Sequence, residues 1–323
     1  MKSIATWKLI NSSLENEIAV MLLYVLESSG SSPGRQGFFM AVNAYSEMEG
    51  SIGGGIMEHK FVEMAKEKLR VASHELQVES IRKQLHDKSA AKNQSGMICS
   101  GEQTIFSYRV QQSDAATIQS IITSLEQNKN GTLHLFPSGI NFSKTAPEKD
   151  FHFAMLSEED WEYAEKTGYK NHLFIIGGGH CALAFSKLMR SMNFYIRIYD
   201  ERKDLNTLVG NDAVHEKHFI NDYSQLNELI PSGNNHYVVI MTLGYRSDDT
   251  ALRALLDKKF KYFGILGSAN KIQKMFDEYR QEGIDDTLLK QIHAPAGLTI
   301  RSQSPEEIAV SIAAEIIQIK NAP

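Results

Sequence analysis

The second half of the chain contains an apolar run, Leu173–Ile176, that does not alternate with polar residues and ends at three successive glycines. Such a run is typical of a strand covered on both faces. A second apolar run, Phe194–Tyr199, ends at Asp200. The pattern predicts strand, glycine turn, helix and strand in succession, because apolar side chains between the runs recur at helical spacing at Leu183, Phe185, Leu188, Met189 and Met192.

The glycine turn has the form G-x-G-x-x-A. Gly177 permits a tight turn, Gly179 lets the backbone approach a phosphate, and Ala182 allows the helix to pack closely on the strand. Asp200 stands at the tip of the second predicted strand, where an acidic side chain can hold a ribose hydroxyl. Together these features predict a Rossmann unit.

Strand and helix patterns continue to alternate after Asp200, with strands predicted at 218–220, 236–241 and 262–266. We therefore expect a doubly wound parallel sheet in the order 3-2-1-4-5, with ligands beyond the carboxyl ends of its strands. Arg246 and Lys271 fall at that edge. Each is either a phosphate ligand or a solvated charge at a helix end.

The first half predicts a short helix, then two strands joined by the polar loop Ser28–Gly37. Long connections in compact domains are often functional, and Arg35 in this loop is either a solvated charge or an anion ligand. Further on, residues 137–150 have the composition of a surface loop, and residues 151–170 show no clear pattern. The N-terminal part is therefore expected to be a separate α/β domain.

A second glycine cluster, Gly50–Gly55, precedes apolar residues at helical spacing. Unpaired amides and the helix dipole make such a helix N-terminus receptive to phosphate or carboxylate. The alternative is that the glycines only let the turn pass close to a neighbouring backbone. The first interpretation predicts an anion site at the backbone amides of this cluster.

Composition limits the remaining possibilities. The length of 323 residues, with 42% hydrophobic residues, suits two domains, and we place them at 1–168 and 169–323. A net charge of −5 gives no support to nucleic-acid binding, and no apolar run reaches membrane-spanning length. A soluble cytoplasmic protein is expected. Its two cysteines, Cys99 and Cys181, are expected to be reduced thiols, and Cys99 is either a small buried hydrophobe or a reactive group.

Several segments together resemble the xanthine dehydrogenase accessory protein family, XdhC/CoxI. In the first half they are Gly30–Pro33 with Gly37 and Met40, Gly50–Gly55 with Glu58, and Met97–Cys99. In the second half they are Gly177–His180, Asp200–Arg202, Gly264–Ser268 with Lys271, and His293–Leu298 before Ser304–Ala309. The resemblance covers nearly the whole chain.

The resemblance implies a non-catalytic maturation factor. Such a protein binds molybdenum cofactor (molybdopterin), helps it acquire or keep its terminal sulfur, and passes it to a client molybdenum hydroxylase such as xanthine dehydrogenase. A cysteine desulfurase is the implied sulfur donor, Cys99 is a possible molybdenum or sulfur ligand, and a homodimer is expected. The residues expected to bind the cofactor are Arg35, Ser51, Gly53, Gly54, Gly55, Glu58, Cys99, Gly177, Gly179, His180, Asp200 and Lys271.

The chain also departs from the family pattern. Gly34 stands where the family often has arginine, Ser100 replaces a glycine, and Leu243 and Tyr245 replace histidines. Two alternative functions stay open: an NAD(P)-dependent oxidoreductase and a nucleotide-sensing regulatory protein, either with NAD(P) or another nucleotide in the Rossmann crevice. The small molecule that stays with the purified protein would distinguish the three.

Overall fold

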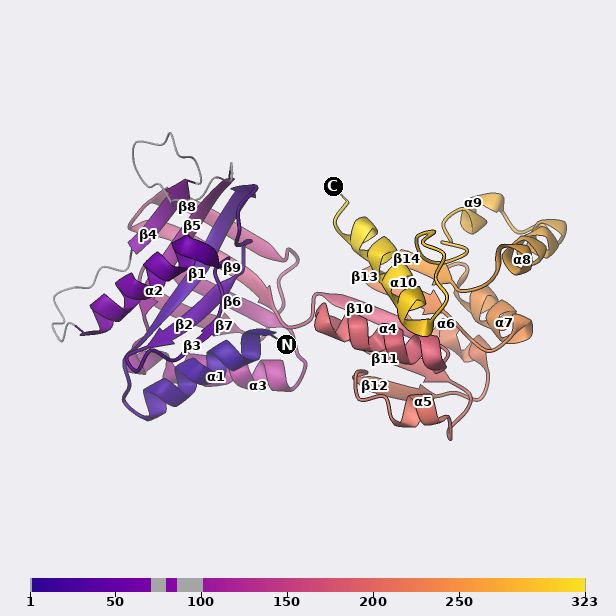
Figure 1. Ribbon diagram of the computed structural model, residues 1–323, viewed down its shortest axis with the longest axis horizontal. Coiled ribbons are helices and arrows are strands. Elements are labelled where there is room, and N and C mark those ends of the chain that lie inside the picture. The colour runs from indigo at the N-terminus through magenta and orange to yellow at the C-terminus, as the bar shows by residue number, and fades with distance from the viewer. Residues whose placement is uncertain (1, 71–79, 86–100, 323) are drawn as a thin grey trace. The chain divides into compact units, whose positions relative to one another are not determined.

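The chain divides into two compact units, Met1–Gly168 and Tyr169–Pro323. The computed structural model describes residues 2–70, 80–85 and 101–322 (Figure 1). Each unit has its own hydrophobic core, and we describe them in turn. In the described residues no helix is both long and apolar enough to cross a membrane.

The first sheet of the N-terminal unit is antiparallel, with strand order β3-β2-β1-β5-β4. Its central strand is buried on both faces from Val20 to Leu26, because a helix covers one face and the rest of the unit's core covers the other. The strands are β1 (Val20–Gly30), β2 (Phe39–Asn43), β3 (Met48–Gly50), β4 (Ser80–Leu85) and β5 (Gly101–Arg109). The predicted pairing of the first two strands across the polar loop is confirmed.

A second antiparallel sheet has the order β7-β6-β9-β8. It corrects the prediction of a surface loop at residues 137–150, because Gly139–Ser143 pairs with the preceding strand across a short turn. The turn residues dominated the sequence pattern and hid the strand. The strands are β6 (Gly131–Phe136), β7 (Gly139–Ser143), β8 (Phe151–Ser157) and β9 (Asp160–Thr167).

Three α-helices complete the described part of this unit: α1 (Lys2–Glu15), α2 (Gly55–Arg70) and α3 (Ala115–Glu126), with a 3-10 turn, η1 (Gln112–Asp114), before α3. Helix α2 buries Met57 and Phe61 against one face of the first sheet. Helices α1 and α3 contact each other and help close the main core, which contains both tryptophans, Trp7 and Trp161.

The C-terminal unit is built on a parallel sheet of order β12-β11-β10-β13-β14. Numbered along the chain, this is the predicted order 3-2-1-4-5, and the predicted Rossmann-type fold class is confirmed. The strands are β10 (Asn171–Ile176), β11 (Phe194–Asp200), β12 (Glu216–Phe219), β13 (Gly233–Ile240) and β14 (Phe260–Ile265).

Helices cover both faces of the parallel sheet. On one face α4 and α10 pack together (Figure 1), and on the other lie α7 and α8. At the start of the last helix, Ser304 and Glu307 form a capping box. The helices are α4 (His180–Ser191), α5 (Asn206–Val209), α6 (Leu226–Leu229), α7 (Tyr245–Leu255), α8 (Ala269–Gln281), α9 (Asp286–Leu289) and α10 (Pro305–Lys320), with a 3-10 turn, η2 (Tyr223–Gln225).

The segment before α10 is tied to that helix through one carboxylate. Glu315 accepts hydrogen bonds from the hydroxyl of Tyr262 at 2.6 Å and from the amide of Gly297 at 2.8 Å, and its other oxygen lies 3.1 Å from His293 Nδ1. Gly297 is required here, because a Cβ would lie 2.3 Å from the hydroxyl of Ser311. The family-like segment 293–298 therefore docks the last helix.

Candidate cofactor crevice

A crevice of about 610 Å³ lies beyond the carboxyl ends of β10 and β13 in the C-terminal unit. This is where open parallel sheets bind ligands. The lining combines the glycine turn and polar side chains with apolar side chains. The lining residues are Gly179, His180, Cys181, Arg202, Asp204, Leu205, Asn206, Thr207, Met241, Thr242, Leu243 and Leu266.

The two outer glycines of the turn do different things. Gly177 has a φ of +104°, and a Cβ there would lie 2.4 Å from the carbonyl oxygen of Met241, so backbone packing requires glycine. Gly179, the N-cap residue of α4, has a φ of −71° and would place a Cβ with no atom within 4 Å. The space in front of α4 is therefore open because residue 179 has no side chain.

Asp200 has a different environment from the one we expected. Its side chain is fully buried, and one oxygen accepts the amide of Gly178 at 2.6 Å. Arg202 donates to both oxygens, from Nε at 2.9 Å and from Nη2 at 2.7 Å, and its amide also donates at 2.8 Å. A carboxylate has about four acceptor positions, and all are used. The expected contact with a ribose hydroxyl is thus replaced by a structural role in holding the turn and the arginine.

The charges of this pair stabilise each other. Burial alone would raise the pKa of Asp200, but the hydrogen bonds from Arg202 and Gly178 outweigh it and hold the pKa below its ordinary value. The same contact raises the pKa of Arg202. In the sequence Arg202 stands out only as a neighbour of Asp200, whereas the structure makes it the charged residue at this end of the crevice.

Lys271 also has a different role from the expected one. Its Nζ contacts Asp248, whose carboxylate is fully buried. The other oxygen of Asp248 accepts the hydroxyl of Thr242 at 2.6 Å. Lys271 does not line the crevice, so in this arrangement its pair with Asp248 fixes the loop between β13 and α7.

Of the two departures after β13, only Leu243 makes the crevice rim less polar. Leu243 is 82% exposed and lines the crevice. Tyr245 instead turns to Glu278, to which its hydroxyl donates a hydrogen bond. In this chain the positions of the two family histidines therefore hold an exposed apolar side chain at the crevice and a contact between α7 and α8.

His180 and Cys181 occupy the first turn of α4 and line the crevice. His180 is exposed, and Cys181 is partly buried. Burial, reinforced by the negative charge of Glu306, raises the pKa of the Cys181 thiol, which disfavours the thiolate. Thr207, which no sequence pattern singles out, donates to the carbonyl of Gly178 at 2.6 Å and so supports the glycine turn.

The glycine cluster of the N-terminal unit has a built-in occupant. One oxygen of Glu58 accepts the hydroxyl of Ser51 at 2.7 Å and the amides of Ile52 and Gly54 at 2.9 and 3.0 Å. The amides are thus arranged to bind an anion, as expected, but they already donate their hydrogen bonds to the carboxylate of Glu58. Gly53 and Gly55 have positive φ and shape this loop.

The polar loop before β2 packs directly on that cluster. Gly34 is buried, and Gln103 donates from Nε2 to the carbonyls of Gly34 at 3.0 Å and Ile52 at 3.2 Å. Arg35 is exposed and donates to the carbonyl of Gly30 at 2.9 Å. Thus Gly34, the glycine cluster and Gln103 form one packed unit. Cys99 and Ser100 lie outside the described residues.

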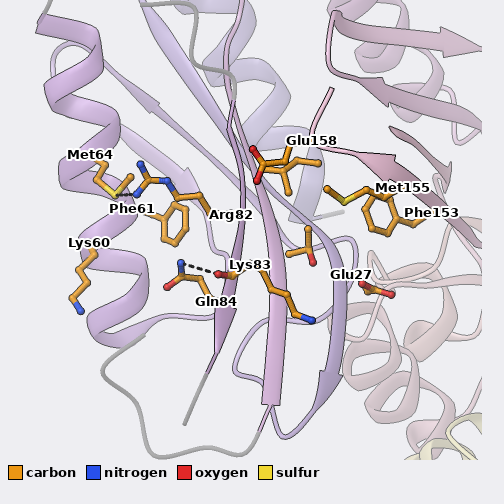
Figure 2. Close-up of a pocket in the computed structure, with 12 residues that line it drawn as sticks. Glu27, Lys60, Phe61, Met64, Arg82, Lys83, Gln84, Phe153, Met155 and Glu158 are labelled. Atoms are coloured by element: carbon orange, nitrogen blue, oxygen red, sulfur yellow. Dashed lines mark hydrogen bonds between the residues drawn. The ribbon is translucent and has the colours of Figure 1, made fainter. Parts of the chain in front are cut away.

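The N-terminal unit also carries a groove of about 860 Å³ around β4. Figure 2 shows Phe61 and Met64 of α2 on one side of this strand and Phe153 and Met155 of β8 on the other. Arg82 Nη1 lies 3.6 Å from the sulfur of Met64, and Lys83 is paired with Glu102 at 2.6 Å. The groove is lined by charged groups of both signs, so its charge does not point to one class of ligand.

Among the described residues no three His, Cys, Asp or Glu side chains are placed to hold a metal ion.

The parallel sheet, the glycine turn and the crevice define the C-terminal unit as a Rossmann domain. Residues 173–316 match the XdhC Rossmann domain, and residues 13–79 match the XdhC and CoxI family. The chain belongs to the XdhC and CoxI family, and the resemblance found in the sequence is confirmed.

Individual relatives agree with this assignment. The chain is 29% identical over 155 residues to the uncharacterized protein YqeB of Escherichia coli K12, covering 48% of this chain. It is 35% identical over 82 residues to a probable xanthine dehydrogenase subunit of Bacillus subtilis 168, covering 25% of this chain. The matches span 28% and 23% of these relatives' lengths. A crystal structure of a xanthine dehydrogenase from Bacillus halodurans has the same fold, with a TM-score of 0.67, 20% identity, and coverage of 99% of this chain and 96% of that one.

Proposed function

We propose that this protein is an accessory factor in the maturation of a xanthine dehydrogenase-type molybdenum hydroxylase, and that it binds molybdenum cofactor and delivers the sulfurated form. Family membership and the name of the Bacillus subtilis relative support the maturation role. The observation that carries the binding role is the open space in front of Gly179, where a phosphate can approach the first turn of α4.

The crevice residues fit a phosphorylated heterocycle. Gly179 has no side chain to accept from the amides at the start of α4, so these donors face the crevice. Leu205, Met241 and Leu266 give an apolar wall for a ring system. When bound, the cofactor supplies the molybdenum and its terminal sulfur. The protein's own part is to hold the phosphate, cover the ring and keep water away from one face.

The N-terminal glycine cluster has a different part in this proposal. Because Glu58 fills it, the cluster serves to fix the loop that contains Gly34 and does not bind the cofactor phosphate. We also propose that a cysteine desulfurase supplies the sulfur and that the protein is a homodimer. On α10, Val310 and Ile317 stay exposed although the rest of the apolar face packs inward.

The test is cofactor retention and client activation. The protein is purified from a host that makes molybdenum cofactor, and its bound small molecule is identified by native mass spectrometry, absorbance and molybdenum content. We expect a pterin with molybdenum and an increase in client hydroxylase activity. Nucleotide alone, with no effect on the client, would support the sensing alternative, and steady-state hydride transfer would support the oxidoreductase.

Cysteine variants sharpen this test. A thiolate can hold molybdenum or accept persulfide sulfur, whereas a hydroxyl does neither well. We expect Cys99→Ser to lower cofactor retention and client activation. Cys181→Ser is the matched control, because the pKa of the Cys181 thiol is raised and its thiolate disfavoured. Equal client activation by the two variants would remove Cys99 from the mechanism.

A further inference from the structure

The buried pair of Asp200 and Arg202 bears on which ligands the crevice selects. In a Rossmann unit the residue at the tip of the second strand faces the ribose end of the ligand. Here the carboxylate at that place is fully buried and the guanidinium covers it, with the arginine side chain 38% exposed. A ligand entering the crevice therefore meets the donor groups of a guanidinium at this end, with the balancing carboxylate buried behind it.

Arg202 is also held in a fixed orientation. It uses the edge formed by Nε and Nη2 to bind both oxygens of Asp200. The second edge of the guanidinium, formed by Nη1 and the remaining hydrogen of Nη2, has no hydrogen-bond partner among the residues described by the structure. A planar guanidinium edge matches the oxygens of a phosphate with two parallel hydrogen bonds.

We propose that Arg202 recognises a phosphomonoester at the ribose end of the crevice. This inference rests on the crevice being a ligand site, as in the proposed function, and adds the chemical class of the ligand. A monoester is preferred to a diester because it carries more charge and leaves three oxygens free for the guanidinium edge. Two ligands carry this group: a dinucleotide with a 2′-phosphate on its adenosine ribose, and a pterin with a terminal phosphate.

The surrounding charges leave Arg202 as the selecting group. Asp204 lines the crevice and Glu201 is close enough to act on Arg202, but both are exposed, so water and salt screen their repulsion of an anion. Lys203 is exposed and does not line the crevice. This makes Lys203→Gln a matched control, since it removes one positive charge next to Arg202 without touching the crevice.

The first arm of the experiment titrates the full chain with NADP⁺ and with NAD⁺, which differ only by the 2′-phosphate. We expect NADP⁺ to bind at least tenfold more tightly, and Arg202→Gln to abolish this preference while Lys203→Gln keeps it. Because removing Arg202 leaves a buried carboxylate, the double variant Asp200→Asn with Arg202→Gln is measured in parallel. Arg202→Lys keeps the charge but loses the planar edge, and it should lose most of the preference.

The second arm measures pterin retention in protein from a host that makes molybdenum cofactor. Loss of pterin from the double variant but not from Lys203→Gln assigns the monoester to the pterin, even if NADP⁺ does not bind. Equal affinity for NADP⁺ and NAD⁺, together with unchanged pterin retention in the double variant, overturns the inference. Selective NADP⁺ binding without client activation leaves this inference standing and rejects the proposed function.

Discussion

Gly34 and Ile52 approach each other so closely that a Cβ on residue 34 would lie 2.0 Å from the carbonyl oxygen of Ile52. The same Cβ would lie 2.5 Å from Nε2 of Gln103. Both neighbours are held, one by the turn of the glycine cluster and the other by its two hydrogen bonds. The arginine that the family often has at this position cannot be accommodated in this arrangement, and Arg35 next to it points to the protein surface instead.

Gly34→Ala is therefore expected to lower the free energy of unfolding of the N-terminal unit by roughly 3 kcal/mol, because backbone and side chain must both move. Trp7 and Trp161, the two tryptophans of the chain, both lie in this unit, so tryptophan fluorescence during urea unfolding reports on it alone. Gly54→Ala is the control: its Cβ meets no atom within 4 Å, so only its φ of +75° costs about 1 kcal/mol. Equal losses in the two variants would contradict the packing argument.

Local patterns were enough to predict the Rossmann half of the fold. Its strands are apolar runs, its turn is rich in glycine, and its parallel sheet limits the possible topologies. The strand Gly139–Ser143 was missed because turn residues flank it and its pairing partner decides its structure.

The candidate site was predicted less completely, for one physical reason. The sequence identified groups that can bind an anion, but it could not tell whether the protein itself already occupies them. Asp200, Lys271 and Glu58 all have the expected location and all are paired within the chain. Lys271 pairs with Asp248 from another helix, which one sequence does not show. Asp200 and Glu58 pair with near neighbours in the chain, but whether they do so depends on how the loop backbone folds.

The carboxylate of Glu58 is expected to act as a replaceable anion. Glu58→Ala leaves the amides of Ile52 and Gly54 without a hydrogen-bond acceptor. We therefore expect the free energy of unfolding of the N-terminal unit to fall by about 1–2 kcal/mol. Sulfate should recover part of this loss, because the empty amides then bind it. Glu67→Ala, an exposed position on the same helix, is the control. If sulfate stabilises both variants equally, the cluster does not bind anions.

His215 should make the C-terminal unit sensitive to acid. Burial, and then the charge of Arg190, lower the pKa of His215 to about 4, while an unfolded chain has a histidine pKa near 6.5. Between these values the unfolded state binds more protons, so stability is fully present above about pH 6.5 and falls as the pH drops toward 4. We expect the free energy of unfolding to fall by about 1–2 kcal/mol over this pH range. This is less than the full difference in pKa corresponds to, because the ring is partly exposed.

Hydrogen exchange of peptides from β10 and β11 between pH 5 and 7, corrected for the intrinsic rate, measures this dependence. His215→Phe should flatten it, although the baseline stability falls because the amide of Ile196 loses its acceptor. His180→Gln, an exposed histidine of the same unit, should leave the slope unchanged. A residual slope persists in His215→Phe, because burial also lowers the pKa of His236. An unchanged slope in His215→Phe would show that its titration is not coupled to folding.

Gly179→Asp tests whether the space in front of α4 is a binding site. The backbone at residue 179 has a φ of −71°, and a Cβ there meets no atom within 4 Å, so the fold should tolerate a side chain. An aspartate at the N-cap also stabilises a helix relative to glycine, by roughly 0.3 kcal/mol. Its carboxylate would nevertheless occupy the place of a phosphate and repel it. We expect cofactor content to fall at least tenfold, with a melting temperature equal to or above that of the wild type.

Gly179→Ala, which adds the Cβ without the charge, should give an intermediate loss of cofactor content. Full cofactor content in the aspartate variant would show that the crevice is not the cofactor site and would move the search to the N-terminal unit.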